Sequence, residues 1–172
     1  VYEVAYSSEL ANSIRQTSDG GFILATWTAA FGAGDYDIWV VKLDASGGIE
    51  WQKAYGGTRT DHASSVSQTQ DGGYVVAGYT HSFGAGDRDF ILLKLDGSGG
   101  IEWQRTFGGS GRDGVPTYMN QDESVEQTTD GGYLLGGITK SFGAGEEDLW
   151  VLKLDRYGYI PTCGVIGSPN LM

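Results

Sequence analysis

The chain has 172 residues, among them 29 glycines, one cysteine, and 22 acidic against 11 basic side chains, for a formal net charge of −11. This length is enough for one domain with a buried core. The negative charge argues against a nucleic-acid backbone or an anionic membrane surface as partner, because both attract positive charge. No apolar run reaches the roughly 20 residues of a membrane helix, and the lone Cys163 excludes an intrachain disulfide.

The first 55 residues predict five short strands. The segment Val1–Tyr6 alternates apolar and polar residues and matches the fourth strand of the unit that follows it. That unit contains four strands, joined by turns in which Asp and Gly recur: Ser13–Thr17, Phe22–Thr28, Asp37–Leu43 and Ile49–Tyr55.

The four-strand unit occurs three times, as the spacing of Asp35, Asp87 and Glu146 shows. An internal repeat of this length indicates a repeat architecture. We therefore expect a single repeat domain over residues 1–172, with units at about 13–57, 65–109 and 124–166 and with residues 1–6 as a complementing strand. The third unit carries Pro161 where its fourth strand would run, and proline cannot donate to a β-ladder.

The third strand of each unit decides how the sheets are expected to pack. It is apolar on both faces in every copy, as in Ile38–Val41, Phe90–Leu93 and Leu149–Leu152. A sheet wetted on one side would alternate instead, so both faces should be covered. Propeller-like blades packed face to face provide this cover, and Val1–Tyr6 would close the last blade.

Three blades are fewer than the usual four to eight. Three arrangements are therefore open: a tight three-bladed ring, two chains that complete a six-bladed ring, or part of a longer propeller. A β-trefoil, which also has three four-stranded units, is the alternative fold.

The repeat Q-T-x-D-G-G-[YF], S-F-G-A-G-x-x-D and [VL]-K-L-D-x-x-G-x-I-x-W resembles tandem β-propeller repeats of secreted or surface proteins of bacteria and archaea. The stretches Leu43–Trp51 and Leu95–Trp103 are also similar to the tryptophan-docking repeats of quinoprotein dehydrogenases. No counterpart of the cofactor ligands of those enzymes is found. The resemblance implies the fold and an extracellular or cell-surface location, although the chain begins at Val1 without a signal peptide.

Paired acidic residues follow the Gly-Ala-Gly loop of each unit and would form a ring on one rim of a propeller. Several carboxylates in one place suit Ca²⁺, so the candidate metal ligands are Asp35, Asp37, Asp87, Asp89, Glu146 and Asp148. The alternative is that Asp37, Asp89 and Asp148 accept hydrogen bonds from loop N–H groups. Nothing in the sequence requires a cofactor.

Aromatic residues beside these carboxylates are candidates for stacking on a sugar ring. The expected ligand-binding residues are Trp27, Tyr79, Asp35, Asp87 and Glu146. By contrast, Asp19, Asp71 and Asp130 are expected to form turns, and Lys42, Lys94 and Lys153 to pair with neighbouring carboxylates.

These features predict a non-enzymatic extracellular module that binds a glycan or a protein, or assembles into homo-oligomers through its edge strands. The alternative is a carbohydrate-active hydrolase with a carboxylate pair on the rim, which needs two carboxyl groups of different pKa in one cleft. No residue is assigned a catalytic role, because catalysis needs one asymmetric site and these residues recur in every unit.

Overall fold

The protein is an all-β molecule. The computed structural model describes residues 11–114 and 124–161, which contain eleven strands and no helix. It follows that no helix of these residues is long and apolar enough to cross a membrane. The strands form three sheets, and every paired neighbour within them runs antiparallel.

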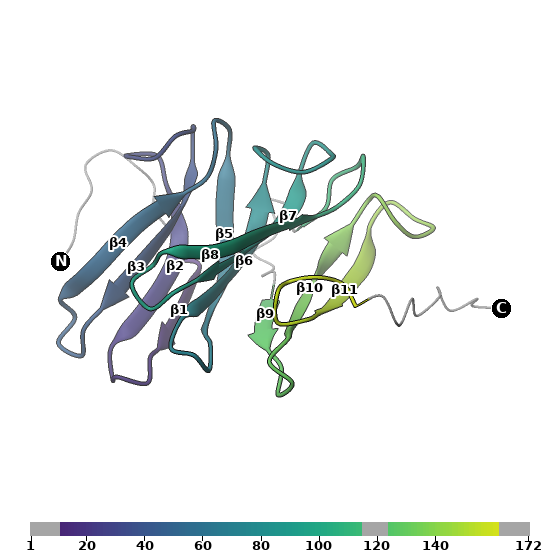
Figure 1. Cartoon of the computed structure of the whole chain (residues 1–172). Helices are drawn as coiled ribbons and strands as arrows, with labels where there is room; N and C mark the ends of the chain where they lie inside the picture. The colour runs from purple at the N-terminus through teal and green to yellow at the C-terminus, as the bar shows by residue number, and fades with distance from the viewer. Residues whose placement is uncertain (1–10, 115–123, 162–172) are drawn as a thin grey trace.

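Each sheet collects strands that are consecutive in the chain (Figure 1). The first sheet contains β1 (Ser13–Gln16), β2 (Phe22–Thr28), β3 (Asp37–Leu43) and β4 (Ile49–Tyr55). The second contains β5 (Asp61–Gln68), β6 (Tyr74–Thr80), β7 (Asp89–Leu95) and β8 (Ile101–Phe107). The third contains β9 (Ser124–Gln127), β10 (Tyr133–Thr139) and β11 (Asp148–Leu154).

The expected strand boundaries in the first unit are confirmed, apart from one residue at the end of β1. The second sheet begins at Asp61 and not at Ser65, because Asp61 already pairs with Thr80 on β6. Between β3 and β4, and between β7 and β8, the register shifts after Lys42 and Lys94. Such irregularities increase the local twist of the strand that carries them.

The Asp-Gly-Gly hairpins form as expected. The Asp19 carboxylate accepts a hydrogen bond from the N–H of Gly21 at 2.9 Å, and Gly20 adopts a φ of +83° that side-chain-bearing residues rarely take. Asp71 and Asp130 repeat the contact with Gly73 and Gly132 at 3.0 Å.

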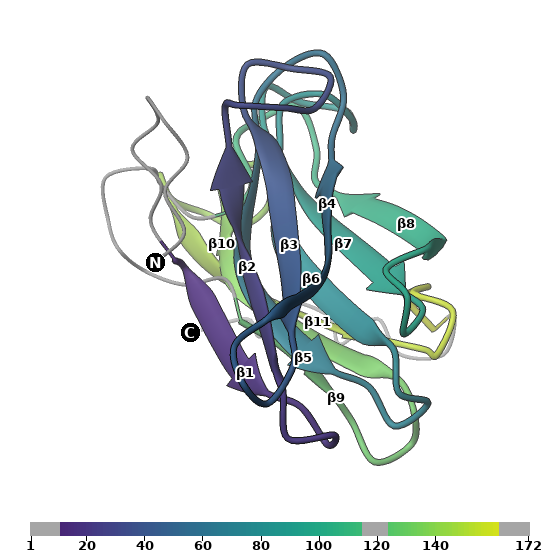
Figure 2. The same cartoon turned by 90° about the vertical axis from the view of Figure 1, so that its left-hand side faces the viewer.

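The sheets stack face to face, one behind another in Figure 2. The apolar core lies in the two layers between them. The layer between the first and second sheets includes Ile38, Val40, Val76 and Leu93. The layer between the second and third includes Phe90, Leu92, Leu135 and Leu152. The middle sheet is therefore covered on both sides, as a strand that is apolar on both faces requires.

The prediction that both faces of every third strand are covered is confirmed for the second sheet, where all seven residues of β7 are buried. Most of β3 is buried as well, but a sheet of the described residues packs on only one of its faces. For β11 the prediction is wrong: Leu149 is 79% exposed and Val151 is 52% exposed. No sheet of the described residues packs on that side.

The described part of the third sheet has three strands, and residues 159–161 are not in a strand, in agreement with the effect expected of Pro161. The three sheets do not close into a ring. The complementing strand at Val1–Tyr6 lies outside the described residues. Each unit pairs its strands within itself, so the sheets are separate layers and not parts of one shared barrel.

Candidate functional site

The three Phe-Gly-Ala-Gly loops lie at one edge of the stack, between β2 and β3, β6 and β7, and β10 and β11 (Figure 1). The second acid of each pair holds its loop. Asp37 accepts N–H hydrogen bonds from Ala33 and Gly34 at 2.8 and 3.0 Å. Asp89 accepts the equivalent pair at 2.7 and 3.0 Å, and Asp148 accepts one at 3.2 Å. The loop-forming role of these three residues is confirmed.

The first acids of the pairs point to solvent at the same edge. Asp35 and Glu146 are exposed. Asp87 binds Arg112 at 2.7 Å and lies 3.7 Å from Arg59, and the hydrogen bond from Arg112 lowers the pKa of Asp87. Residues 11–114 and 124–161 contain no group of three or more His, Cys, Asp or Glu side chains arranged to hold a metal ion. The calcium site stays a prediction.

The aromatic residues expected at this edge form a stack that joins the first and second sheets. His62 lies between Trp27 and Tyr79, with ring centroids at 5.2 and 4.9 Å. The Arg88 guanidinium covers Tyr79 at 4.9 Å. Burial lowers the pKa of His62 to about 4, so this ring is neutral at pH 7. Tyr79 is 5% exposed, which leaves little of its ring for a ligand.

Two buried carboxylate pairs lie beneath the rim loops. Asp89 Oδ1 and Asp113 Oδ2 lie 1.6 and 2.8 Å from the point where a Cβ on Gly108 would be, so at most 4.4 Å separates them. In the first unit, Asp37 Oδ1 and Asp61 Oδ2 lie beside Gly56 in the equivalent arrangement. Asp89 Oδ1 is buried and accepts no hydrogen bond, whereas Asp113 accepts hydrogen bonds from Thr139 and Ser141.

The two members of the Asp89–Asp113 pair have displaced pKa values of opposite direction. Burial, assisted by the charge of Asp113, raises the pKa of Asp89. Burial acts against ionisation of Asp113 as well, but hydrogen bonds from Ser141, Thr139 and Gly109 outweigh it and lower that pKa. Asp89 is therefore the member that binds a proton first as the pH falls.

A groove opens at the opposite edge, between the second and third sheets. It has a volume of about 570 Å³, within the range of about 300–1,000 Å³ that is typical of ligand sites. We call it the inter-sheet groove; its lining residues are Gln70, Asp71, Lys94, Glu102, Trp103, Gln127, Thr129, Asp130, Gly131, Tyr133, Arg156 and Tyr157.

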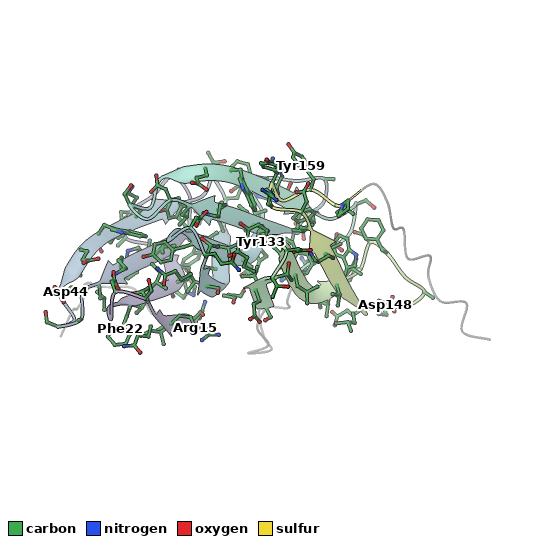
Figure 3. The ribbon with its side chains drawn as sticks, turned by 60° about the horizontal axis from the view of Figure 1, so that its bottom comes forward. Arg15, Phe22, Asp44, Tyr133, Asp148 and Tyr159 are labelled. Carbon is green, nitrogen blue, oxygen red and sulfur yellow. The ribbon has the colours of Figure 1, made fainter. Side chains whose placement is uncertain are left out.

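Aromatic rings form the apolar part of this groove. Trp103 meets Tyr133 edge to face at 5.5 Å, and Tyr133 lies between the second and third sheets (Figure 3). Gly158 lies against the Trp103 ring: a Cβ there would be 2.8 Å from it. Tyr157, in the same turn, is 60% exposed. Burial raises the pKa of Tyr133 to about 12, so its hydroxyl keeps its proton.

Charged groups form the polar part. The Lys94 ammonium is buried and binds Asp71 and Glu102, both at 3.0 Å. Against the effect of burial, hydrogen bonds from Thr69, Gly73 and Lys94 lower the pKa of Asp71 to about 2. The hydrogen bond from Lys153 does most to lower the pKa of Asp130. These carboxylates are ionised at pH 7 and present acceptor oxygens beside the aromatic rings.

The sequence placed the lysine–carboxylate pairs correctly but did not predict the groove. Lys42 binds Asp19 and Glu50 at 2.9 Å in the same geometry, and Trp51 meets Tyr74 edge to face at 5.8 Å. The signal that marks the groove is a difference between units. The turn against Trp103 carries Arg156 and Tyr157, where the turn against Trp51 carries Gly97 and Ser98.

No protein-family model matches this sequence, and no curated protein matches it significantly. The candidate sites therefore rest on geometry alone.

Proposed function

We propose that the chain is a non-enzymatic, extracellular binding module of the β-propeller type, and that it binds a neutral glycan in the inter-sheet groove. The observation that carries the proposal is the exposed Tyr157 ring, set beside Trp103 and ionised carboxylates in one concave site. Flat aromatic surfaces next to hydrogen-bond acceptors suit a sugar, which has an apolar face and an edge of hydroxyl groups.

The charge of the groove favours a neutral ligand over an anionic one. Three carboxylates and two cations line it, and Lys94 is occupied by Asp71 and Glu102. Arg156 is the one exposed cation of the lining. Asp130 is likewise paired with Lys153, so the carboxylates of the groove are balanced by lysines and offer no excess of charge to an ion. Sugar hydroxyl groups can donate to these carboxylates and accept from Arg156.

The propeller-type organisation is supported by the equivalence of the layers. The first two sheets have the same order of four antiparallel strands, and each packs one face on the next sheet. Trp51 and Trp103 each lie against a glycine of the following unit, Gly99 and Gly158. An extracellular location agrees with the resemblance of the repeat to surface proteins, and its test is detection of the protein on intact cells of its source.

Binding is tested with a microarray of neutral oligosaccharides, followed by calorimetry on the sugars retained. Tyr157→Ala is expected to weaken binding about tenfold, because it removes the exposed stacking surface. The matched control is Tyr159→Ala. Tyr159 is 56% exposed and belongs to the same turn, but it lies against Arg105 at 4.3 Å and does not line the groove (Figure 3). Equal loss in both variants, or no retained sugar, would refute the proposal.

The hydrolase alternative requires a carboxyl group that is protonated near pH 7. The groove offers Asp71 and Asp130, whose pKa values are lowered. On the rim, the pKa of Asp89 is raised, but the side chain is buried against Gly108. Hydrolysis of any oligosaccharide retained on the array would favour this alternative.

A further inference from the structure

We infer that the free face of the third sheet is an assembly surface, and that its occupant is the first sheet of a second copy of this chain. We call it the outer face of the third sheet. Residues that are paired across β10 and β11 share a face, which assigns to it Leu134, Gly136, Ile138, Leu149, Val151 and Lys153.

The first and second sheets show what this face does elsewhere in the molecule. In the first sheet the equivalent residues contact the second sheet: Ile23, Ala25, Trp27, Ile38, Val40 and Lys42. In the second sheet the equivalent residues are all buried, and Val75, Ala77, Phe90 and Leu92 among them pack in the core layer shared with the third sheet; the full set is Val75, Ala77, Tyr79, Phe90, Leu92 and Lys94. The same face is thus covered by the next sheet at both junctions of the described stack.

On the third sheet this face is uncovered but keeps an apolar character. Leu149, Val151 and Leu134 are exposed, and no sheet of the described residues contacts them. A sheet face that is selected for contact with water would carry polar side chains at these positions. Contiguous exposed apolar residues on a sheet are typical of an interaction surface.

The chemistry of the occupant follows from the two junctions. At each junction, one sheet covers the face of the sheet before it. The face that does so carries an aromatic residue at the start of its second strand and aliphatic residues beside it, as Tyr74, Val76 and Leu93 show in the second sheet. The third sheet covers its neighbour with Tyr133, Leu135 and Leu152.

The first sheet has a face of the same composition, and no sheet of the described residues packs on it. Phe22, Leu24, Trp39 and Leu43 are partly exposed there, and Val41 lies among them. Its residues are at the same strand positions as the residues with which the second and third sheets each pack on the sheet before them. The stack therefore ends in two complementary faces, one at each side.

A contact between these two faces is head to tail, so it generates a ring if the rotation closes and a filament if it does not. Two copies would place six sheets around one axis, which lies within the four to eight of known propellers. The closed dimer uses both faces of each copy and leaves none exposed. The inference does not depend on glycan binding, because the inter-sheet groove lies between two sheets of one copy.

The test is the mass of the purified full-length chain by sedimentation velocity, from low to high micromolar concentration. The wild type is expected to reach twice the chain mass of 18.4 kDa. The double variant Leu149→Glu, Val151→Glu is expected to stay at the single-chain mass, because it places charge on the contact. Ile101→Glu is the matched control: Ile101 is as exposed as Val151 but lies on β8, away from both faces, so this variant should still dimerise.

The head-to-tail geometry is tested with a charge on the other face. Leu24→Glu, or Leu43→Lys if that variant does not fold, should also yield single chains, with a circular dichroism spectrum like that of the wild type. A wild type that stays a single chain overturns the inference, as does a double variant that still dimerises. Loss of the dimer in the third-sheet variant with its retention in the first-sheet variants would show a symmetric contact between two third sheets, and would overturn the assignment of the occupant.

Discussion

The third strands of the second and third sheets, β7 and β11, have similar sequences but different surroundings. In β7 the side chains of Phe90 and Leu92 are buried in the layer shared with the third sheet, and Lys94 is buried as well. In β11 the equivalent Leu149, Val151 and Lys153 face outward. The comparison shows that the local pattern is enough to form a strand, whereas the burial of that strand depends on a neighbour that the pattern does not specify.

The largest effect is expected when one large apolar side chain is removed at the same position of each of these two sheets. Phe90→Ala should lower the free energy of unfolding by about 3–5 kcal/mol, because it leaves a cavity in a closed layer. Leu149→Ala should change it by less than about 0.5 kcal/mol at a protein concentration where the chain is monomeric. Urea unfolding of both variants measures this. Similar losses would mean that the outer face of the third sheet is covered in solution.

The lysines provide the next test. Lys94 is 2% exposed and has two carboxylate partners, whereas Lys153 is exposed and binds Asp130 at 2.8 Å. Lys94→Met should cost about 1–3 kcal/mol. This is below the value for a fully buried pair, because Asp71 and Glu102 are themselves half exposed. Lys153→Met should cost less than about 1 kcal/mol, as for a surface ion pair. Thermal unfolding measures the stability of both variants. Equal losses of unfolding free energy would show that the two lysines have the same surroundings in solution.

The raised pKa of Asp89 in the second sheet predicts that the stability of the protein depends on pH. Between the usual value of 3.8 and the raised pKa, the folded protein keeps a proton that the unfolded chain has released, so stability falls as the pH rises through that window. Asp89→Asn should remove this decline and add about 1 kcal/mol at pH 7, since the amide can donate to Asp113 and still accept from the loop.

The matched control for this variant is Asp148→Asn, at the same position of the third sheet and with one loop hydrogen bond. The measurement is the unfolding free energy of wild type and variants from pH 4 to pH 8. A decline that persists in Asp89→Asn would show that another group causes it.

The smallest effect is expected from Gly136→Ala on the outer face of the third sheet. A Cβ there meets no atom within 4 Å, and the equivalent residues of the other two sheets are Ala25 and Ala77. The variant should stabilise the chain by about 0.4–1 kcal/mol, because alanine restricts the unfolded state. As a contrast, Gly78→Ala should be destabilising, since its Cβ would lie 1.8 Å from the carbonyl oxygen of His62. A destabilised Gly136→Ala would indicate a close neighbour on this face.

Much of the local fold could be predicted from the sequence. The limits of β2, β3 and β4 follow from apolar runs between Asp-Gly turns, and the lysine–carboxylate pairs follow from their recurrence. The start of β5 could not, because Asp61 joins the strand through tertiary contacts with Thr80 and Ser82.

The candidate site was harder to predict. The residues that recur in every unit include the acids of the rim, where Asp37, Asp89 and Asp148 hold the loops. The inter-sheet groove depends on residues that do not recur, above all Arg156 and Tyr157. The recurring residues stabilise each unit in the same way, whereas a single site arises where the units differ.

The sequence by itself determined that strands form, where most of them begin and end, and which turns join them, because alternation, glycine and short-range hydrogen bonds act within a few residues. Only the tertiary structure decided which faces are covered, that the three sheets form an open stack, and where a groove appears. These properties depend on contacts between side chains from different units, such as Phe90 with Trp150 and Trp103 with Tyr133, and no local pattern encodes them.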